Sequence, residues 1–104
     1  MRHGFIKTAA GTPKIQVADC VYNAGEILKL IRQMETEGAK IMAFPELCIT
    51  GYTCQDLFWQ TLLLDSAKEQ LVWLAGETSQ VDALIIVGLP WEYNGKLYNV
   101  AAVL

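Results

Sequence analysis

The spacing of apolar residues predicts two amphipathic helices in this chain. The first is expected to begin at Asn23, a favoured N-cap residue with Glu26 three positions later, as in a capping box. It should run to about Glu37 and stop at Gly38, and the second should cover residues 62–78. The predicted apolar stripes are Ile27, Leu30, Ile31 and Met34 in the first helix, and Leu64, Ala67, Leu71, Leu74 and Ala75 in the second.

Three segments have patterns typical of buried strands. Residues 14–20 alternate apolar and polar side chains, which predicts a strand with one buried face. Two more strands are predicted, over residues 41–47, which begin with the apolar run 41–45, and over the apolar run 83–89, as expected inside a sheet that helices cover. Pro90 is expected to end the second of these runs. Strands therefore alternate with helices, which indicates an α/β fold.

The end of the chain predicts a β-hairpin. Asn94-Gly95 is a strong signal for a type I′ turn, so residues 97–104 should return antiparallel to the preceding strand. The sequence stops inside this apolar strand. We expect the chain to be the front part of a longer fold. A sheet face with Ile85, Val87, Val100, Val103 and at least one of the three tryptophans (Trp59, Trp73 and Trp91) should be left uncovered. A small closed fold is the alternative.

Composition narrows the choice of partners. The chain has 104 residues, of which 53% are hydrophobic and 18% charged, and its formal net charge is −3. Without a basic footprint, neither nucleic acid nor an anionic membrane is an expected partner. No stretch reaches the roughly 18 apolar residues of a membrane helix. The N-terminus lacks the apolar core of a signal peptide, so a cytoplasmic location is expected.

Few residues offer chemistry of their own. The three cysteines, Cys20, Cys48 and Cys54, have neither a disulfide nor a zinc spacing and are expected to be reduced, buried thiols. His3 is the single histidine, so no metal site is predicted. The glycine motifs of dinucleotide sites and P-loops are absent, and so is the serine hydrolase elbow.

Glu46 is the candidate that remains. It follows the apolar run 41–45, and ligands in open α/β sheets bind beyond the carboxyl ends of strands. Partial burial would suit this carboxylate to the role of general base. Taken alone, a glutamate here is also consistent with a solvated or structural carboxylate.

Glu46 lies in the motif Phe44-Pro45-Glu46-Leu47, which is followed by Thr50-Gly51-Tyr52. This motif resembles the first catalytic motif of the nitrilase, or carbon–nitrogen hydrolase, superfamily. Three further segments are His3-Gly4-Phe5, Asp56-Leu57-Phe58 and Leu97-Tyr98-Asn99. With them, the chain is most similar over its whole length to the glutaminase domains of glutamine-dependent NAD+ synthetases within that superfamily.

The resemblance implies that residues 1–104 are the N-terminal portion of a nitrilase-like α-β-β-α sandwich, without the synthetase domain. The superfamily uses a Glu-Lys-Cys triad, and its general base maps onto Glu46. The lysine and the cysteine nucleophile lie downstream of the matched region; Lys96 and Cys48 do not match them. This chain alone is therefore expected to be inactive. Tyr52 is a candidate substrate-binding residue, with a packed aromatic as the alternative.

The resemblance also implies partners and cofactors. Glutamine would be the substrate, and the chain would join the rest of its own domain and a synthetase domain in a homo-oligomer. The glutaminase part would need no cofactor, whereas the synthetase domain would use ATP and Mg²⁺. Two alternatives remain open: another amidase of the superfamily, or a non-catalytic α/β interaction module.

Overall fold

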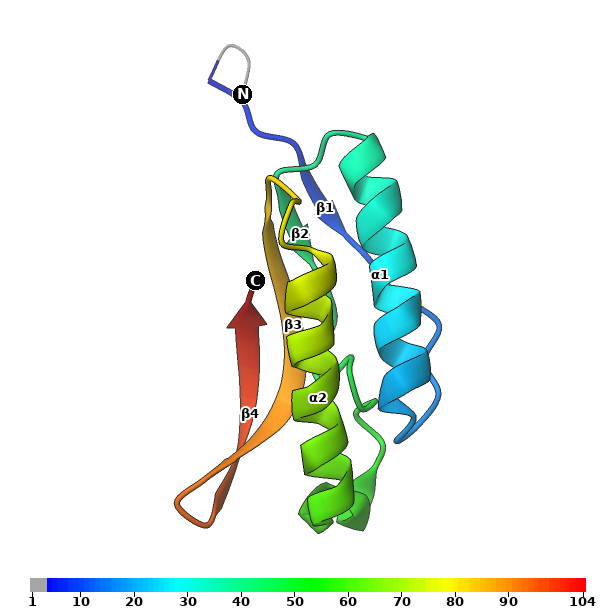
Figure 1. Ribbon diagram of the computed structural model, residues 1–104, viewed down its shortest axis with the longest axis vertical. Helices are drawn as coiled ribbons and strands as arrows, with labels where there is room; N and C mark the ends of the chain where they lie inside the picture. The colour runs from blue at the N-terminus through cyan, green and yellow to red at the C-terminus, as the bar shows by residue number, and fades with distance from the viewer. Residues whose placement is uncertain (1–3) are drawn as a thin grey trace.

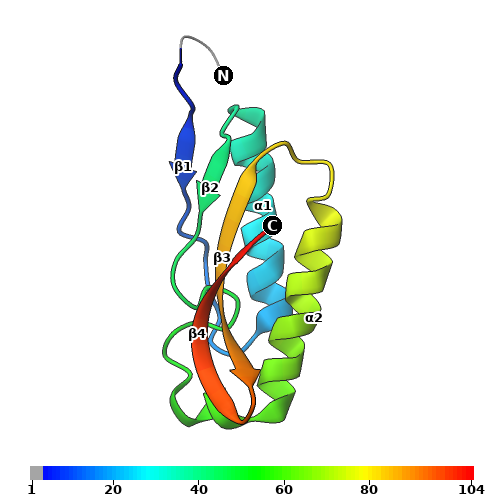
Figure 2. The same cartoon turned by 90° about the vertical axis from the view of Figure 1, so that its left-hand side faces the viewer.

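The computed structural model describes residues 4–104, apart from the side chain of Asp56, as one β-sheet and one layer of helices (Figure 1). The strands lie in the order β1-β2-β3-β4; the first three are parallel and β4 is antiparallel to β3. Both helices lie on the same side of the sheet (Figure 2). The elements are β1 (Thr8–Ala10), α1 (Cys20–Thr36), β2 (Ile41–Ala43), the 3-10 helix η1 (Gln55–Trp59), α2 (Thr61–Glu77), β3 (Leu84–Tyr93) and β4 (Lys96–Val103).

The predicted strand over residues 14–20 is wrong, because β1 lies earlier, at Thr8–Ala10. In place of a strand partner, the side-chain amide of Asn23 forms hydrogen bonds with the backbone of Gln16 in this segment. Gln16 N donates to Asn23 Oδ1 at 2.8 Å, and Asn23 Nδ2 donates to Gln16 O at 2.8 Å. Ile15 and Val17 are exposed, so the apolar alternation does not mark a buried face.

Helix α1 begins earlier than predicted. Asp19 is its N-cap, and the Asp19 side chain accepts a hydrogen bond from Tyr22 N at 3.1 Å. Asn23, the predicted cap, lies inside the first turns and is completely buried. The predicted end is close, since α1 stops at Thr36 and Gly38 follows with a φ of +84°. Helix α2 matches its prediction to within one residue at each end.

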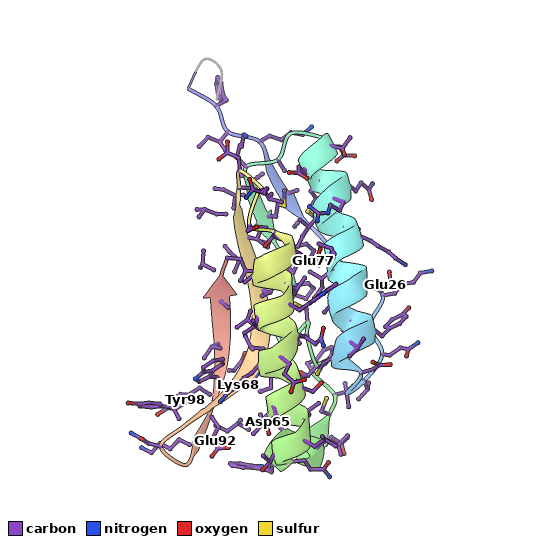
Figure 3. All side chains as sticks on the ribbon, in the orientation of Figure 1. Glu26, Asp65, Lys68, Glu77, Glu92 and Tyr98 are labelled. Atoms are coloured by element: carbon purple, nitrogen blue, oxygen red, sulfur yellow. The ribbon has the colours of Figure 1, made fainter. Side chains whose placement is uncertain are left out.

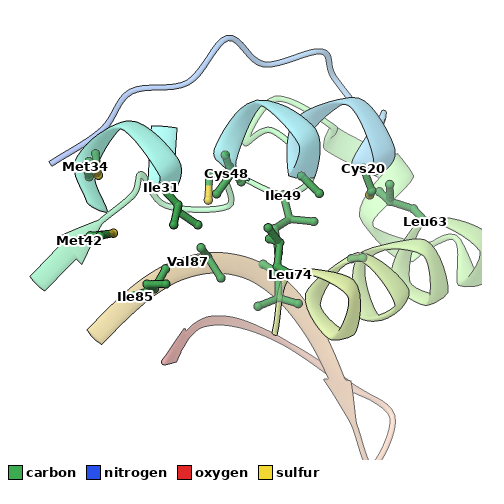
Figure 4. Close-up of a cluster of buried hydrophobic side chains, with 14 of the residues drawn as sticks. Cys20, Ile31, Met34, Met42, Cys48, Ile49, Leu63, Leu74, Ile85 and Val87 are labelled. Atoms are coloured by element: carbon green, nitrogen blue, oxygen red, sulfur yellow. The ribbon is translucent and has the colours of Figure 1, made fainter. Parts of the chain in front are cut away.

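The core lies between the helices and the sheet (Figure 4). Most of the predicted stripes point into it, although Leu30 and Leu71 are only partly buried and Ala75 is exposed. The helices pack on the face of β3 that carries Ile85 and Val87. Val100, which pairs with Leu89, is partly buried against the same core. Of the tryptophans, Trp59 and Trp73 lie on η1 and α2, and Trp91 contacts Lys68 of α2. The expectation that Ile85, Val87, Val100 and a tryptophan lie on an uncovered face is therefore wrong.

The opposite face of the sheet carries no helix among residues 4–104 (Figures 1 and 2). Side chains alternate along a strand, so Leu84 and Ile86 point to this face. Leu84 is 54% exposed, and Val103, which pairs with Ile86, is 61% exposed. The exposure of Val103 agrees with the prediction. We call this surface the open face.

The strands around the open face differ in length from their predictions. Strand β2 ends at Ala43, and β3 continues through Pro90 to Tyr93.

Pro90 fits within β3 because of the direction in which its backbone points. Ile86 O accepts a hydrogen bond from Phe44 N, which follows β2, whereas Ile85 O accepts one from Leu104 N, which follows β4. Even-numbered residues of β3 therefore point their backbone N–H and C=O groups away from β4. Pro90 has the same parity as Ile86 and lies beyond the end of β2. Its missing N–H therefore interrupts no ladder bond.

The hairpin between β3 and β4 is confirmed. Asn94 and Gly95 have φ values of +51° and +74°, as a type I′ turn requires. The hairpin, with Glu92 and Tyr98, extends away from the helices (Figure 3). Lys68 Nζ of α2 lies 4.7 Å from the ring centroid of Trp91 on β3, and this cation–π contact joins the helix layer to the sheet near the hairpin.

No helix within residues 4–104 combines the length and the apolar character needed to cross a membrane.

Candidate functional site

Glu46 lies on a tight turn three residues beyond the end of β2. Phe44 N still donates to Ile86 O of β3 at 3.0 Å, and the chain then leaves the sheet. Cys48 N donates to Pro45 O at 3.2 Å, and Gly51 N donates to Leu47 O at 2.7 Å. Leu47 has a φ of +51°, in the left-handed region that branched and bulky residues seldom adopt. We call residues 45–51 the Glu46 loop.

Gly88 of β3 provides the surface on which this loop lies. A Cβ atom at Gly88 would be 2.5 Å from Leu47 N and 3.0 Å from Pro45 O, so a side chain would collide with loop backbone. Gly88 also bonds the loop, because its O accepts from Ile49 N at 3.2 Å and its N donates to Cys48 Sγ at 3.4 Å. The glycine therefore allows the loop to lie directly against β3.

The far end of the Glu46 loop is tied to α1. The buried Asn23 side chain donates a second hydrogen bond from Nδ2, to Ile49 O at 2.9 Å. Ala18 N donates to Thr50 O at 2.8 Å. Ile49 and Thr50 are completely buried. The backbone that carries Glu46 is thus fixed by β3 on one side and by α1 on the other.

The Glu46 carboxylate has one polar partner among the described residues, the side chain of Asn99 on β4. Asn99 Nδ2 donates to Glu46 Oε1, across 53 positions of sequence. No ion pair within residues 4–104 includes Glu46. The side chain is exposed, so these residues do not provide the partial burial expected from the sequence.

Glu46 stands on the rim between two hollows. One, of about 260 Å³, is lined by the loop, by Gly88 and Ala101, and by Asn99. The other, of about 310 Å³, is lined by Pro13, Ile15 and Tyr52 as well as by Glu46. The structure thus brings the two predicted site residues, Glu46 and Tyr52, to one hollow. Tyr52 is 74% exposed within this chain.

Cys48 and Lys96, which do not match the cysteine and lysine of the family triad, both lie where a catalytic role is not expected. Cys48 is buried under α1 near Ile31 and Val87 (Figure 4). Burial raises the pKa of the Cys48 thiol, which disfavours the nucleophilic thiolate. Lys96 is exposed at the hairpin turn. His3 lies outside the described residues. Among the side chains that the structure describes, which exclude Asp56, no three His, Cys, Asp or Glu gather as a metal site would require.

Three residues of the site were not predicted from the sequence: Asn23, Gly88 and Asn99. The sequence predicted Asn23 only as a helix cap, and it placed Asn99 only in a motif of the family. A lone glycine inside an apolar strand is a known signal for close backbone approach, so Gly88 could have been found. The Asn99 contact had no such signal, since it depends on the register of the hairpin.

Comparisons with known proteins identify the family of this chain. The model of the carbon–nitrogen hydrolase family matches residues 7–104. A glutamine-dependent NAD(+) synthetase of Mycobacterium bovis is 33% identical over 103 residues, and one of Aquifex aeolicus is 36% identical over 88 residues. These matches cover 99% and 85% of this chain, but only 15% of the length of either relative.

Solved structures show the same fold. A glutamine-dependent NAD(+) synthetase from Cytophaga hutchinsonii superposes with a TM-score of 0.84 at 30% identity, over 91% of this chain and 16% of the other. An amidase from Nesterenkonia superposes with a TM-score of 0.78 over 99% of this chain and 39% of the other, at 20% identity that supports the fold alone. The fold and the extent of the family match together show that this chain belongs to the carbon–nitrogen hydrolase family.

Proposed function

We propose that this chain is the N-terminal portion of the glutaminase domain of a glutamine-dependent NAD+ synthetase. Relatives of that name match it nearly end to end, although it spans only 15% of their length. The observation that carries the proposal is the placement of Glu46. The motif glutamate lies on a loop fixed to β3 and α1, at the rim of two hollows and beside the open face.

In this proposal Glu46 is the general base. An ionised carboxylate can accept up to about four hydrogen bonds, and Asn99 takes only one, at Oε1. The carboxylate can therefore accept a proton from a group that approaches from a hollow. Its exposure within this chain leaves room for that group to come from a later part of the protein.

The proposed reaction needs a thiol and a cation that this chain does not contribute. Glu46 takes the proton of a cysteine thiol, and the thiolate attacks the side-chain amide carbon of glutamine. The proton passes to the departing nitrogen, which leaves as ammonia, and a thioester remains. Glu46 then removes a proton from water, whose attack releases glutamate and restores the thiol. A lysine and backbone N–H groups would stabilise the developing oxyanion.

The remaining parts of the proposal follow from the same assignment. Tyr52 would line the glutamine pocket, because it shares a hollow with Glu46. The open face would receive the rest of the domain and so complete an α-β-β-α sandwich. The glutaminase reaction needs no cofactor, whereas a synthetase domain elsewhere in the protein would use ATP and Mg²⁺. We propose a cytoplasmic homo-oligomer.

The test compares two nitrogen sources in the full-length gene product. NAD+ formation from deamido-NAD+ and ATP is measured with glutamine and, separately, with ammonium chloride. Glu46→Gln should abolish the glutamine-supported reaction and leave most of the ammonia-supported one. Loss of neither reaction would contradict the role of Glu46. Absence of NAD+ formation by the unmodified protein with either source would contradict the synthetase assignment.

Another amidase of the carbon–nitrogen hydrolase family is the second candidate, because the family match over residues 7–104 does not separate the two; the Nesterenkonia amidase shares the fold alone. Its identity to this chain is lower than that of the synthetases, at 20% against 33% and 36%. Hydrolysis of short aliphatic amides in preference to glutamine, without NAD+ formation, would select this candidate. A non-catalytic module would show neither activity.

A further inference from the structure

The polar contact of Glu46 comes from an element that enters the structure late in the chain. Asn99 lies on β4, opposite Pro90 of β3, and its side chain is on the open face with Ala101. Gly88 is on the same face and carries the Glu46 loop. The hairpin and the glycine together bring an amide from β4 to a carboxylate that follows β2.

We infer that Asn99 is a positioning residue that fixes the orientation of the Glu46 carboxylate for proton transfer; this inference rests on the function proposed above. The direction of the hydrogen bond follows from its chemistry. An ionised carboxylate only accepts hydrogen bonds, so the amide nitrogen of Asn99 faces it as the donor. The bond holds Oε1 and so restricts rotation of the carboxylate, while Oε2 has no hydrogen-bond partner among residues 4–104.

A neutral amide suits this task better than a charged side chain. A lysine or arginine at position 99 would form an ion pair that competes with the proton donor for the carboxylate. An aspartate would have almost the shape of asparagine but would repel Glu46. Packing does not account for the contact either, because both side chains are exposed within the described residues.

The test uses two substitutions in the full-length gene product, with glutamate release from glutamine as the assay. Asn99→Ala removes the donor, and Asn99→Asp keeps the shape but reverses the interaction. We expect kcat to fall about 10- to 100-fold in Asn99→Ala, as for other small misplacements of a catalytic group, and further in Asn99→Asp. KM should change much less than kcat, because Asn99 acts through the base and not on the substrate.

Tyr98→Phe is the matched control, since it removes a polar group from the neighbouring position on the other face of β4 and should leave kcat unchanged. Unchanged thermal midpoints would show that the Asn99 variants fold. Wild-type kcat in Asn99→Asp would mean that only the shape of residue 99 matters and would overturn the inference. So would an unchanged kcat in Asn99→Ala, even where Glu46→Gln is inactive and the proposed function stands. Full activity of Glu46→Gln would overturn both.

Discussion

The backbone nitrogen of Leu47 occupies the space next to Gly88 where a side chain would begin. An ideal Cβ on Gly88 would lie 2.5 Å from this nitrogen, a separation that real Cβ atoms do not tolerate. The next atom, Pro45 O at 3.0 Å, also belongs to the backbone, so no side-chain rotation can relieve the collision. The Glu46 loop can therefore lie against β3 only because residue 88 has no side chain.

Gly88→Ala should move the Glu46 loop and destabilise the fold. Overpacking of this kind costs about 1–3 kcal/mol, and the thermal midpoint should fall accordingly. Gly76→Ala is the matched control, because Gly76 lies in α2 with open space around its Cβ position and alanine favours the helix. Equal thermal midpoints for the two variants would contradict the close approach at Gly88.

Asn23→Ala should destabilise the protein more than a typical polar substitution. It would leave the buried C=O of Ile49 and the part-buried backbone N–H and C=O of Gln16 without their hydrogen-bond partner. We expect a loss of about 2–4 kcal/mol in the free energy of unfolding, measured by urea denaturation.

Asn99→Ala is the control for this prediction, since it removes the same amide from an exposed position. Its effect on stability should stay within about 0.5 kcal/mol. A similarly small effect of Asn23→Ala would show that the Asn23 hydrogen bonds do not hold the segment that precedes α1.

The free energy of unfolding should fall at alkaline pH because of the buried Cys48 thiol. Burial raises the pKa of Cys48, so the folded chain keeps the thiol proton at pH values where the unfolded chain releases it. The free energy of unfolding therefore decreases as pH rises above the ordinary thiol pKa of about 8.5. The pH dependence is measured by urea unfolding between pH 7 and pH 10.

Cys48→Ala isolates the contribution of this thiol, because other groups titrate in the same range. The variant should lose less stability than the wild type over the alkaline interval. A steeper loss in Cys48→Ala would contradict the direction of the pKa shift.

The open face predicts association of the isolated 104-residue chain. Leu84 and Val103 expose apolar surface on a sheet with no covering layer among residues 4–104. We expect light scattering to show dimers or larger species, and Leu84→Lys with Val103→Lys to shift the population toward monomer. Val72→Lys with Val21→Lys, on the exposed sides of the helices, is the control pair. A monomeric wild-type chain would contradict this role of the open face.

The sequence predicted those parts of the fold that depend on local patterns. The period of α2 and the Asn94-Gly95 turn determine their own structure, so both were found within a residue or two. The strand expected at residues 14–20 does not form, and the backbone N–H and C=O of Gln16 are hydrogen-bonded instead by the side chain of Asn23, seven positions later. The uncovered face was assigned to Ile85 and Val87 because an apolar run does not reveal which of its alternate residues face the helices.

The candidate site shows the same division. Glu46 was found from its motif and its place after a strand, but the contacts that position it were not. Those contacts come from Gly88 and Asn99, which lie 42 and 53 positions away and are brought to the loop by strand pairing and hairpin register. Pairing between distant strands is a tertiary property that local patterns do not encode.

The most direct test of the account is ammonia release from glutamine by the full-length gene product with Glu46→Gln. Glu92→Gln is the matched control, because Glu92 is an exposed carboxylate on β3 and lines neither hollow beside Glu46. We expect Glu46→Gln to lower kcat by at least about a thousandfold, as loss of a member of a catalytic triad does, and Glu92→Gln to retain wild-type activity. Wild-type ammonia release by Glu46→Gln would contradict the assignment of Glu46 as the general base.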